Sequence, residues 1–437
     1  MFDSKTPLAF AICTLSFCSG LWSSATFAQT VMADQVLAPQ IELSATANKA
    51  SGLQAVLQTV LRNHPTIKGK QAEIDVSGAL IESAEAGRLP TLSAQANNLN
   101  DEYTQGTLRL KQPLWAFGKI DTSIGQARAQ YDTEQFALLQ VQRQLIEGSA
   151  AAYAKVEGLQ ARAKVAKINI TEHQRLFKRI KQRERGQLAS EADVRLAQSR
   201  VLLARAQQER ITGALQVALN ELESYTLQPV AVDVPVDPAL AALPSIAEIE
   251  SQALAQDADV IYKRARLDVV RLDIKKEKIA SMPTIYAQVE HELLDTQANT
   301  DRTRAGLVFE GSMEGLGFVS RGRVKGAEAR LVAAQEDLNV AMNDIKRRIN
   351  TLMANRNTQH TLSRTQTEVV ATVEETMASF VRQYDSGRKT WIDVLNTQRE
   401  LTEQRLQLAQ YQSDWLILSL RIVTLTGALD RLAGIEV

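Results

Sequence analysis

Apolar side chains recur at alternating spacings of three and four residues from about residue 323 to residue 432. This seven-residue period places them on one face of a helix that packs against a neighbour, as in a coiled coil. A polar break at 384–389 divides the run, and no proline follows Pro283. The pattern therefore predicts two long helices, about 317–383 and 390–432. The apolar positions are Val324, Ala327, Leu331, Ala334, Leu338, Ala341, Ile345 and Leu352, then Leu401, Leu408, Tyr411, Trp415, Leu418, Ile422, Leu425, Leu429 and Leu432.

A second proline-free run lies between Pro113 and Pro229. A polar break at 183–187 divides it, so we expect long helices at about 117–182 and 188–224. At ~1.5 Å per residue, the longest of the predicted helices would measure roughly 100 Å, far more than a compact domain requires. Shorter helical patterns cover 53–86 and 246–279.

Two segments change from helical spacing to strict alternation of apolar and polar residues. They cover about 90–115 and 283–311, and each contains a polar turn. Alternation with a period of two is typical of a strand that has one apolar and one polar face. Each segment therefore predicts a pair of strands. The apolar face carries Leu92, Ala94 and Ala96 in the first segment and Ile285, Ala287, Val289, Leu307 and Phe309 in the second.

The order of these elements repeats along the chain. Pro90 recurs as Pro283 at the start of the second strand pair, and Asp193-Val194 recurs as Asp393-Val394, 200 residues later. Each half reads helix, strand, strand, long helix, long helix, which indicates a tandem duplication. We expect a first repeat at 29–228, a proline-rich linker at 229–245 and a second repeat at 246–437.

The polar faces of the predicted strands are too charged for the core of a sandwich. Four strands also cannot close on themselves, since about eight are needed for the smallest barrels. We expect several copies of the chain to contribute strands to one barrel, with the apolar side toward lipid. Two alternatives stay open: two hairpins on the surface of a soluble helical protein, and a rod-like coiled coil. The charges expected to line the barrel lumen are Arg109, Lys111, Glu290, Glu292 and Glu310.

Composition argues against several classes of function. Lys and Arg together number 50, as do Asp and Glu, so the chain lacks the basic excess of a nucleic-acid-binding protein. Neither a phosphate-binding glycine loop nor a nucleophile elbow is present. We therefore expect no enzymatic activity, no catalytic residue, no cofactor and no metal site. The four histidines stand apart from one another, at His64, His173, His291 and His360.

The N-terminus has the pattern of a secretory signal peptide, predicted at 1–28. Lys5 precedes an apolar run at 8–18, and small residues lead to Ala28, with Ala25 as the second choice for cleavage. A membrane anchor is disfavoured because the run is shorter than the ~20 residues of a span. A lipoprotein is disfavoured because bulky Phe17 precedes Cys18. Both cysteines of the chain fall inside this segment, so we expect no disulfide in the mature protein.

These features together resemble the TolC family of outer-membrane efflux and secretion proteins. The likeness rests on the order of elements, the duplication, the signal peptide, the pattern Gly387…Asp393-Val394-Leu395…Gln398, and the segment Leu114–Lys119. A narrower likeness is to the branch that exports adhesins by type I secretion.

The resemblance implies a mixed α+β membrane protein. Its duplicated helix-strand-strand-helix-helix repeats would form, as a homotrimer, a 12-stranded outer-membrane β-barrel continued by a long periplasmic α-helical barrel. It implies a passive exit duct for type I secretion or, as an alternative, for drug efflux. The implied partners are a periplasmic adaptor (membrane fusion) protein, an inner-membrane transporter of the ABC type, and outer-membrane lipid.

The resemblance also assigns a gate and an adaptor contact to the two turns between the long helices. The first turn departs from the second: its glycine lies seven residues before Asp193 rather than six, and it has no matching tyrosine. The alternative is that Gly387 only ends a helix and Asp393 only favours the start of the next. The residues implied at this periplasmic tip are Gly186, Ser190, Asp193, Tyr384, Gly387, Arg388, Lys389 and Asp393.

Overall fold

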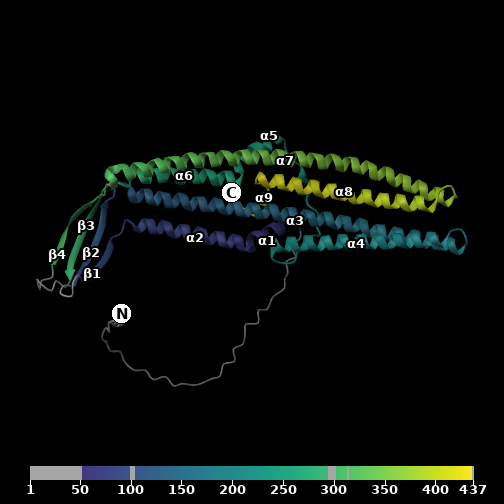
Figure 1. Cartoon of the computed structure of the whole chain (residues 1–437), viewed down its shortest axis with the longest axis horizontal. Coiled ribbons are helices and arrows are strands. Elements are labelled where there is room, and N and C mark those ends of the chain that lie inside the picture. Colours follow the sequence, from purple (N-terminus) through teal and green to yellow (C-terminus); the bar gives the residue numbers. More distant parts are fainter. Residues whose placement is uncertain (1–51, 99–103, 294–301, 313, 436–437) are drawn as a thin grey trace, which may run out of the picture. The chain divides into compact units, whose positions relative to one another are not determined.

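The computed structural model describes residues 52–98, 104–293, 302–312 and 314–435, all of which lie within the unit Asn48–Val437. The predicted signal peptide at 1–28 lies outside the described residues. Figure 1 labels the elements. The strands are β1 (Thr91–Asn98), β2 (Thr104–Trp115), β3 (Thr284–Leu293) and β4 (Arg302–Glu310). The helices are α1 (Leu53–Asn63), α2 (Pro65–Ala86), α3 (Lys119–Arg185), α4 (Glu191–Thr226), α5 (Ile246–Gln256), α6 (Ala258–Ile279), α7 (Phe318–Asp385), α8 (Trp391–Leu425) and α9 (Ala428–Ala433), with short 3-10 helices η1 (Pro238–Ala241) and η2 (Glu314–Gly317).

The two repeats follow the same order of elements. In each, two shorter helices lead into two strands, and the second strand leads into a helix of 67 or 68 residues followed by one of 36 or 35. Both crossings from strand to long helix pass through left-handed backbone, at Phe117-Gly118 and at Leu316-Gly317. The last helix was expected to continue to about 432. It ends at Leu425 instead, because Gly427 adopts a φ of 72° and α9 starts anew.

The four strands form one antiparallel sheet in the order β1-β2-β3-β4. The central pair joins the two repeats, with Arg109 opposite Glu290 and Leu110 opposite Val289. The register places one apolar set on one face, including Leu92, Leu110 and Leu307. The other face carries the charged residues. The alternation seen in the sequence is therefore kept across all four strands.

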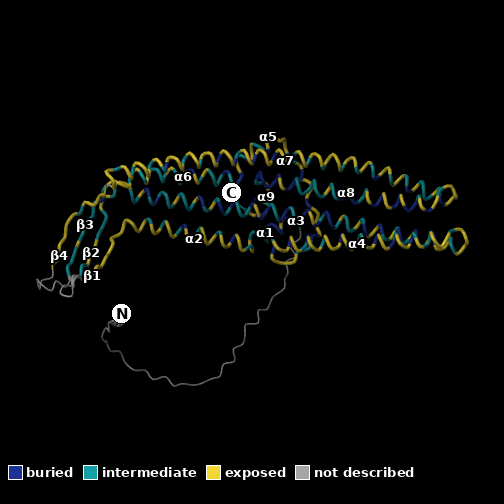
Figure 2. The backbone as a smooth tube through the Cα atoms, viewed as in Figure 1, coloured by how far each residue is buried: buried dark blue, intermediate teal, exposed yellow. Residues whose placement is uncertain are grey.

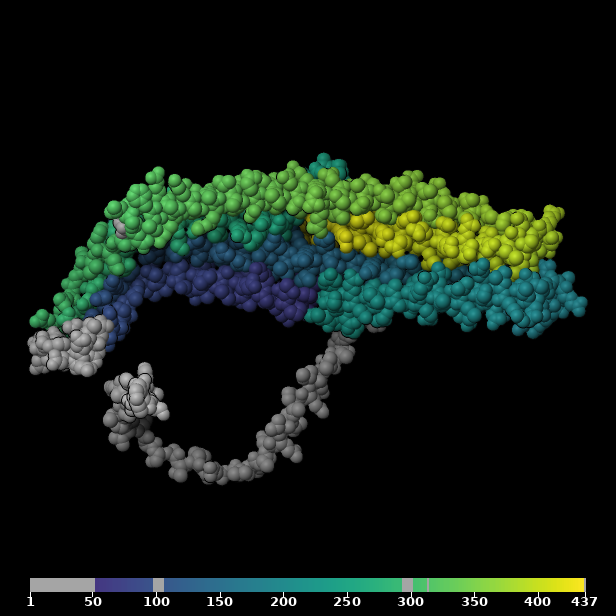
Figure 3. Space-filling model, viewed as in Figure 1, coloured from purple at the N-terminus to yellow at the C-terminus, as the bar shows by residue number. Residues whose placement is uncertain are grey.

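The helices pack side by side in the same order as the strands. Near the sheet, α2 packs on α3, α3 on α6, and α6 on α7. Toward the turns, α4 packs on α3, α3 on α8, and α8 on α7. Figure 3 shows this order from one side, with α7 along one border and α2 followed by α4 along the other. Helix α2 leads into β1, β2 into α3, α6 into β3, and β4 (through η2) into α7. The order of these helices in their layer therefore matches the order of the strands in the sheet.

Four clusters of buried apolar side chains hold the helices together, the smallest formed by Ala166, Ile211 and Leu406. One lies where α1, α3, α4 and the end of α8 meet, around Tyr153 and Leu420. A second joins α5, α6, α7 and α8, and a third lies near the two turns, around Leu395. Figure 2 shows buried and intermediate positions along much of α3, whereas much of α7 and α4 is exposed. In the described part of the chain, every helix is too short or too polar to cross a membrane.

Candidate functional site

The two turns between the long helices have the same backbone geometry. In the first, the amides of Gly186, Gln187 and Leu188 donate to the carbonyls of Gln182, Glu184 and Arg183. In the second, the residues 200 positions later make the same three hydrogen bonds. Gly186 and Ser386 therefore hold equivalent C-cap positions. The duplication is preserved at the level of single hydrogen bonds.

The glycine spacing in the sequence suggested that the backbones of the two turns differ, but they do not. The left-handed residue is Gln187 in the first turn, with a φ of 57°, and Gly387 in the second, with a φ of 76°. Each lies six residues before the aspartate of the next helix. The sequence does not reveal this equivalence, because glutamine rarely adopts left-handed backbone and Gly186, one position earlier, is the residue expected to do so.

Both aspartates of the predicted tip complete capping boxes. Asp193 accepts hydrogen bonds from the backbone and hydroxyl of Ser190, at 3.0 and 2.7 Å. Asp393 accepts the matching bonds from Thr390, at 3.1 and 2.7 Å. The hydrogen bond from the Thr390 hydroxyl, followed by the one from the Thr390 amide, lowers the pKa of Asp393. The two carboxylates therefore satisfy helix N-termini, as in the alternative in which Asp393 favours the start of the next helix.

Tyr384 is the buried centre of the second turn. Its ring lies 5.2 Å from the ring of Trp391, and the Arg183 guanidinium lies 4.6 Å from its centroid. Burial raises the pKa of the Tyr384 hydroxyl. Arg183 belongs to α3, so this cluster joins the first repeat to the second. A guanidinium over an aromatic ring contributes about 0.5–2 kcal/mol, depending on how far it is desolvated.

A second link between the repeats lies one turn away. Arg179 of α3 forms an ion pair with Asp385 at the end of α7. The sequence placed Arg183 in the first turn, but it revealed neither Arg179 nor the contact of Arg183 with Tyr384, because the first turn supplies no local pattern that points to the second. Of the remaining predicted residues, Arg388 is exposed in the turn, and the Lys389 ammonium lies 4.3 Å from the ring centroid of Phe380.

The five charges predicted to line a lumen all lie on one face of the sheet and form ion pairs there. Arg109 pairs with Glu290 at 3.0 Å, and Lys111 pairs with Glu310 at 2.9 Å. Glu292 pairs with Arg304 of β4. Because the pairs run across strands, they also fix the register of the sheet.

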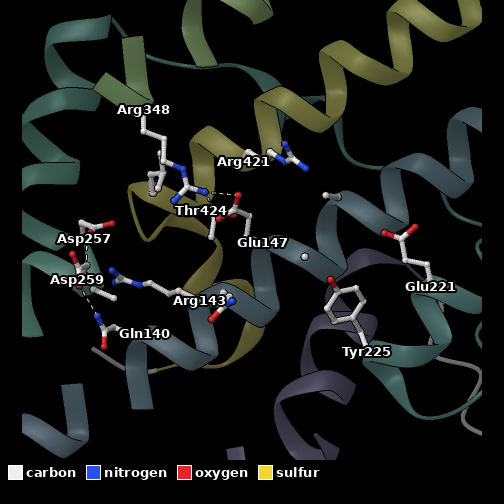
Figure 4. A pocket seen from close by; sticks show the side chains of 15 residues that line it. Gln140, Arg143, Glu147, Glu221, Tyr225, Asp257, Asp259, Arg348, Arg421 and Thr424 are labelled. Carbon is white, nitrogen blue, oxygen red and sulfur yellow. Dashed lines mark hydrogen bonds and ion pairs between the residues drawn. The ribbon is translucent and has the colours of Figure 1, made fainter. Parts of the chain in front are cut away.

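A polar cavity of about 530 Å³ lies halfway along the long helices (Figure 4). Arg348 reaches across it to Glu147 at 2.6 Å, and Gln140 donates to Asp259 at 2.8 Å. Arg143, which also lines the cavity, makes two hydrogen bonds to Asp430, at 2.9 and 2.6 Å. Sequence reasoning missed this cluster too.

The charged residues of this cavity have both signs and pair with one another across different helices. Arg143 links α3 to α9 and to the end of α5, and both members of its pair with Asp430 are buried. Removing one member of a buried pair costs several kcal/mol, because the other is left uncompensated. Within the described residues, no group of three or more His, Cys, Asp or Glu side chains could hold a metal ion. We therefore interpret the cluster as structural: it fixes α3 to α9 and to the end of α5.

This architecture, with a small antiparallel sheet continued by long paired helices, is that of the outer-membrane channel proteins. A membrane protein from Pseudomonas aeruginosa superposes with a TM-score of 0.73 at 18% identity, covering 86% of this chain and 90% of that one. The outer membrane protein VceC from Vibrio cholerae gives 0.71 at 17% identity, covering 86% and 96%.

The sequence comparisons define the family. The model of the outer membrane efflux protein family matches residues 56–226 and 249–428, which is most of the chain. Outer membrane protein TolC of Escherichia coli (strain K12) is 22% identical over 426 residues, covering 88% of this chain and 83% of TolC. The chain belongs to the outer membrane efflux protein family. It is an outer-membrane protein with a periplasmic helical part, as the resemblance predicted.

Proposed function

We propose that this chain is one third of a homotrimeric exit duct. The duct passively conducts substrate that an inner-membrane transporter and a periplasmic adaptor deliver, across the periplasm and the outer membrane. The observation that carries the proposal is that the sheet and the helical layer have free edges on the same two sides of the chain.

On one side the edge consists of β1, α2 and α4, and on the other of β4 and α7. Among the described residues, neither sheet edge has a strand partner, and the helices α2 and α4 do not pack on α7. An unpaired strand edge invites another chain to pair with it. Because the two edges differ, one copy's first edge meets the next copy's second edge. Such head-to-tail contacts close into a ring when the rotation permits.

The helices at both edges expose apolar side chains that a neighbouring copy would cover. On one side, Leu203 of α4 is 59% exposed and Val76 of α2 is 61% exposed. On the other, Val332 and Val340 of α7 are 64% and 57% exposed. Exposed apolar residues on both borders of one layer support lateral packing between copies. With three copies, the sheets supply the twelve strands that the family resemblance implies.

Within this duct, the polar face of the sheet would line the lumen and the two turns would form the periplasmic tip. The paired charges at Arg109, Lys111 and Glu310 suit a water-filled interior. At the tip, Arg183 and Arg179 hold α3 against the end of α7. We propose that these links, repeated in each copy, keep the tip narrow until the adaptor binds at the turns. The chain carries no catalytic role in this scheme, and the transporter supplies the energy.

The edge contacts can be tested by substitution. Leu203→Glu or Val340→Glu introduces a charge at an edge, and we expect loss of the detergent-extracted trimer and of conductance in planar bilayers. Ile168→Glu is the matched control. Ile168 is 50% exposed but lies on α3, whose flanks are covered by α4 and α8. A wild-type protein that fractionates as a soluble monomer, or an edge variant that remains trimeric, would refute the proposal.

For the cargo, we propose type I protein secretion ahead of drug efflux, because the sequence resembles the adhesin-exporting branch. Drug efflux is the second candidate, favoured by the description of the matched family as efflux proteins. Deletion of the gene separates them. Loss of a secreted surface protein with unchanged drug sensitivity supports secretion, and the opposite result supports efflux.

A further inference from the structure

Helices α3 and α8 approach each other very closely at one point. Gly158 of α3 faces Ser413 of α8, and a Cβ placed on Gly158 would lie 2.1 Å from the Ser413 Oγ and 2.4 Å from its Cβ. Non-bonded carbons normally stay about 3.5–4.0 Å apart. Opposite Ser413, only glycine therefore permits this spacing, and a side chain at position 158 would force the helices apart.

Unfilled space lies directly beside this contact. A cavity of about 440 Å³ is lined by residues of α3, α7, α8 and the linker, and both Gly158 and Ser413 belong to its wall. Close-packed helices resist a change of angle because their side chains interdigitate. A narrow contact next to open space leaves α8 room to change its angle to α3.

On the side toward the sheet, the helices are held firmly. Arg356 of α7 donates to the Ala241 carbonyl of η1 at 2.7 Å and to the Ser419 hydroxyl of α8 at 2.8 Å. Arg143 of α3 holds Asp430 in a buried pair. On the side toward the turns, α8 continues along α3 through Thr402, which donates to the Asn169 amide oxygen at 2.7 Å. A displacement at Gly158 would therefore be carried toward the turns.

We propose that Gly158 and Ser413 are positioning residues that set the angle between the α3–α4 and α7–α8 hairpins, and with it the spacing of the two turns. This inference rests on the proposed function where it concerns the opening of the tip. The lever can be estimated from helix geometry: ~1.5 Å per residue gives about 22 Å from Arg143 to Gly158 and about 40 Å from Gly158 to the turn. A shift of about 1 Å at the contact would move the turns apart by about 3 Å.

Spin labels on the two turns test this directly. The only cysteines in the sequence are Cys13 and Cys18; with both replaced by serine, Leu188→Cys and Arg388→Cys place the only labels, on the equivalent exposed turn positions. The labelled full-length chain is assembled with an excess of unlabelled chain, and the distance within one copy is measured. We expect Gly158→Ala to lengthen the distance by about 3 Å. Adding Ser413→Gly should restore it, because that substitution removes both clashing atoms.

Gly213→Ala is the matched control, since Gly213 lies in α4 and a Cβ placed there would meet no atom within 4 Å. It should leave the distance unchanged. Should Gly158→Ala fail to assemble, Ser413→Val adds bulk to the same contact with glycine retained and should also lengthen the distance. A folded Gly158→Ala protein with the wild-type distance, or no restoration by Ser413→Gly, would overturn the inference.

Bilayer conductance separates this inference from the proposed function. We expect Gly158→Ala to raise the open population about threefold, the change that follows when separation of the turns breaks the exposed ion pair between Arg179 and Asp385. If the distances respond as expected while the wild-type protein conducts nothing, the positioning role stands and the duct is wrong. If the wild-type protein conducts but neither distance nor conductance responds, the positioning role is wrong.

Discussion

The two inter-helix turns share one backbone but differ in what their side chains do. Their three turn hydrogen bonds and their capping boxes coincide position by position. The second turn has Tyr384 and Trp391 packed together, where the first has Glu184 and Glu191. The comparison teaches that the duplication keeps the hydrogen bonds that reverse the chain, whereas the contacts between the repeats occur once: arginines of the first repeat meet Tyr384 and Asp385 of the second.

The largest difference should appear at the tyrosine position. Tyr384→Ala removes a buried ring and leaves Arg183 without its aromatic partner, so we expect about 3 kcal/mol of destabilisation and a rise in conductance. Glu184→Ala, at the equivalent position of the first turn, should change both by little. Urea unfolding of the solubilised protein and bilayer recordings provide the measurements. Equal effects of the two substitutions would show that the turns are functionally alike.

The caps should behave alike instead. Ser190→Ala and Thr390→Ala each remove a hydroxyl that accepts from the aspartate amide, at 3.2 and 3.3 Å. We expect each to cost about 1 kcal/mol, again measured by urea unfolding. A cost in only one turn would mean that the shared geometry does not reflect shared energetics.

The left-handed positions should respond in opposite directions. Gly387→Ala forces a Cβ into left-handed backbone and should destabilise the protein by about 1 kcal/mol. Gln187→Gly relieves the same strain in the first turn and should be neutral or slightly stabilising. Thermal unfolding midpoints of the two variants test this. A stabilising Gly387→Ala would contradict the assignment of that position.

The smallest expected effect is a pH dependence of the second cap. The pKa of Asp393 is lowered in the folded protein, chiefly by the Thr390 hydroxyl. The unfolded state therefore binds the proton first, so the contribution of the cap is present above the ordinary aspartate pKa and is lost as the pH falls below it. Asp393→Asn should flatten the acid limb of the stability profile, and an unchanged slope would argue against the cap.

Much of the architecture could be predicted from local patterns. The seven-residue period, the proline-free runs and the alternating segments predicted the long helices and the four strands, because each signal needs only a few neighbouring residues. The polar face that carries Arg109 and Glu290 could also be predicted, because side chains at every second position of a strand lie on the same face. The end of α8 at Leu425 was missed, because the seam continues across the break at Gly427.

What the sequence alone determined, then, is the set of elements, their duplication and the family they belong to. The tertiary structure decided which distant residues meet: Arg183 with Tyr384, Arg143 with Asp430, and Gly158 with Ser413. It also showed that Gln187, rather than Gly186, is the counterpart of Gly387. The physical reason is that periodicity fixes the face a side chain occupies, whereas its partner depends on how helices from opposite repeats align along their length.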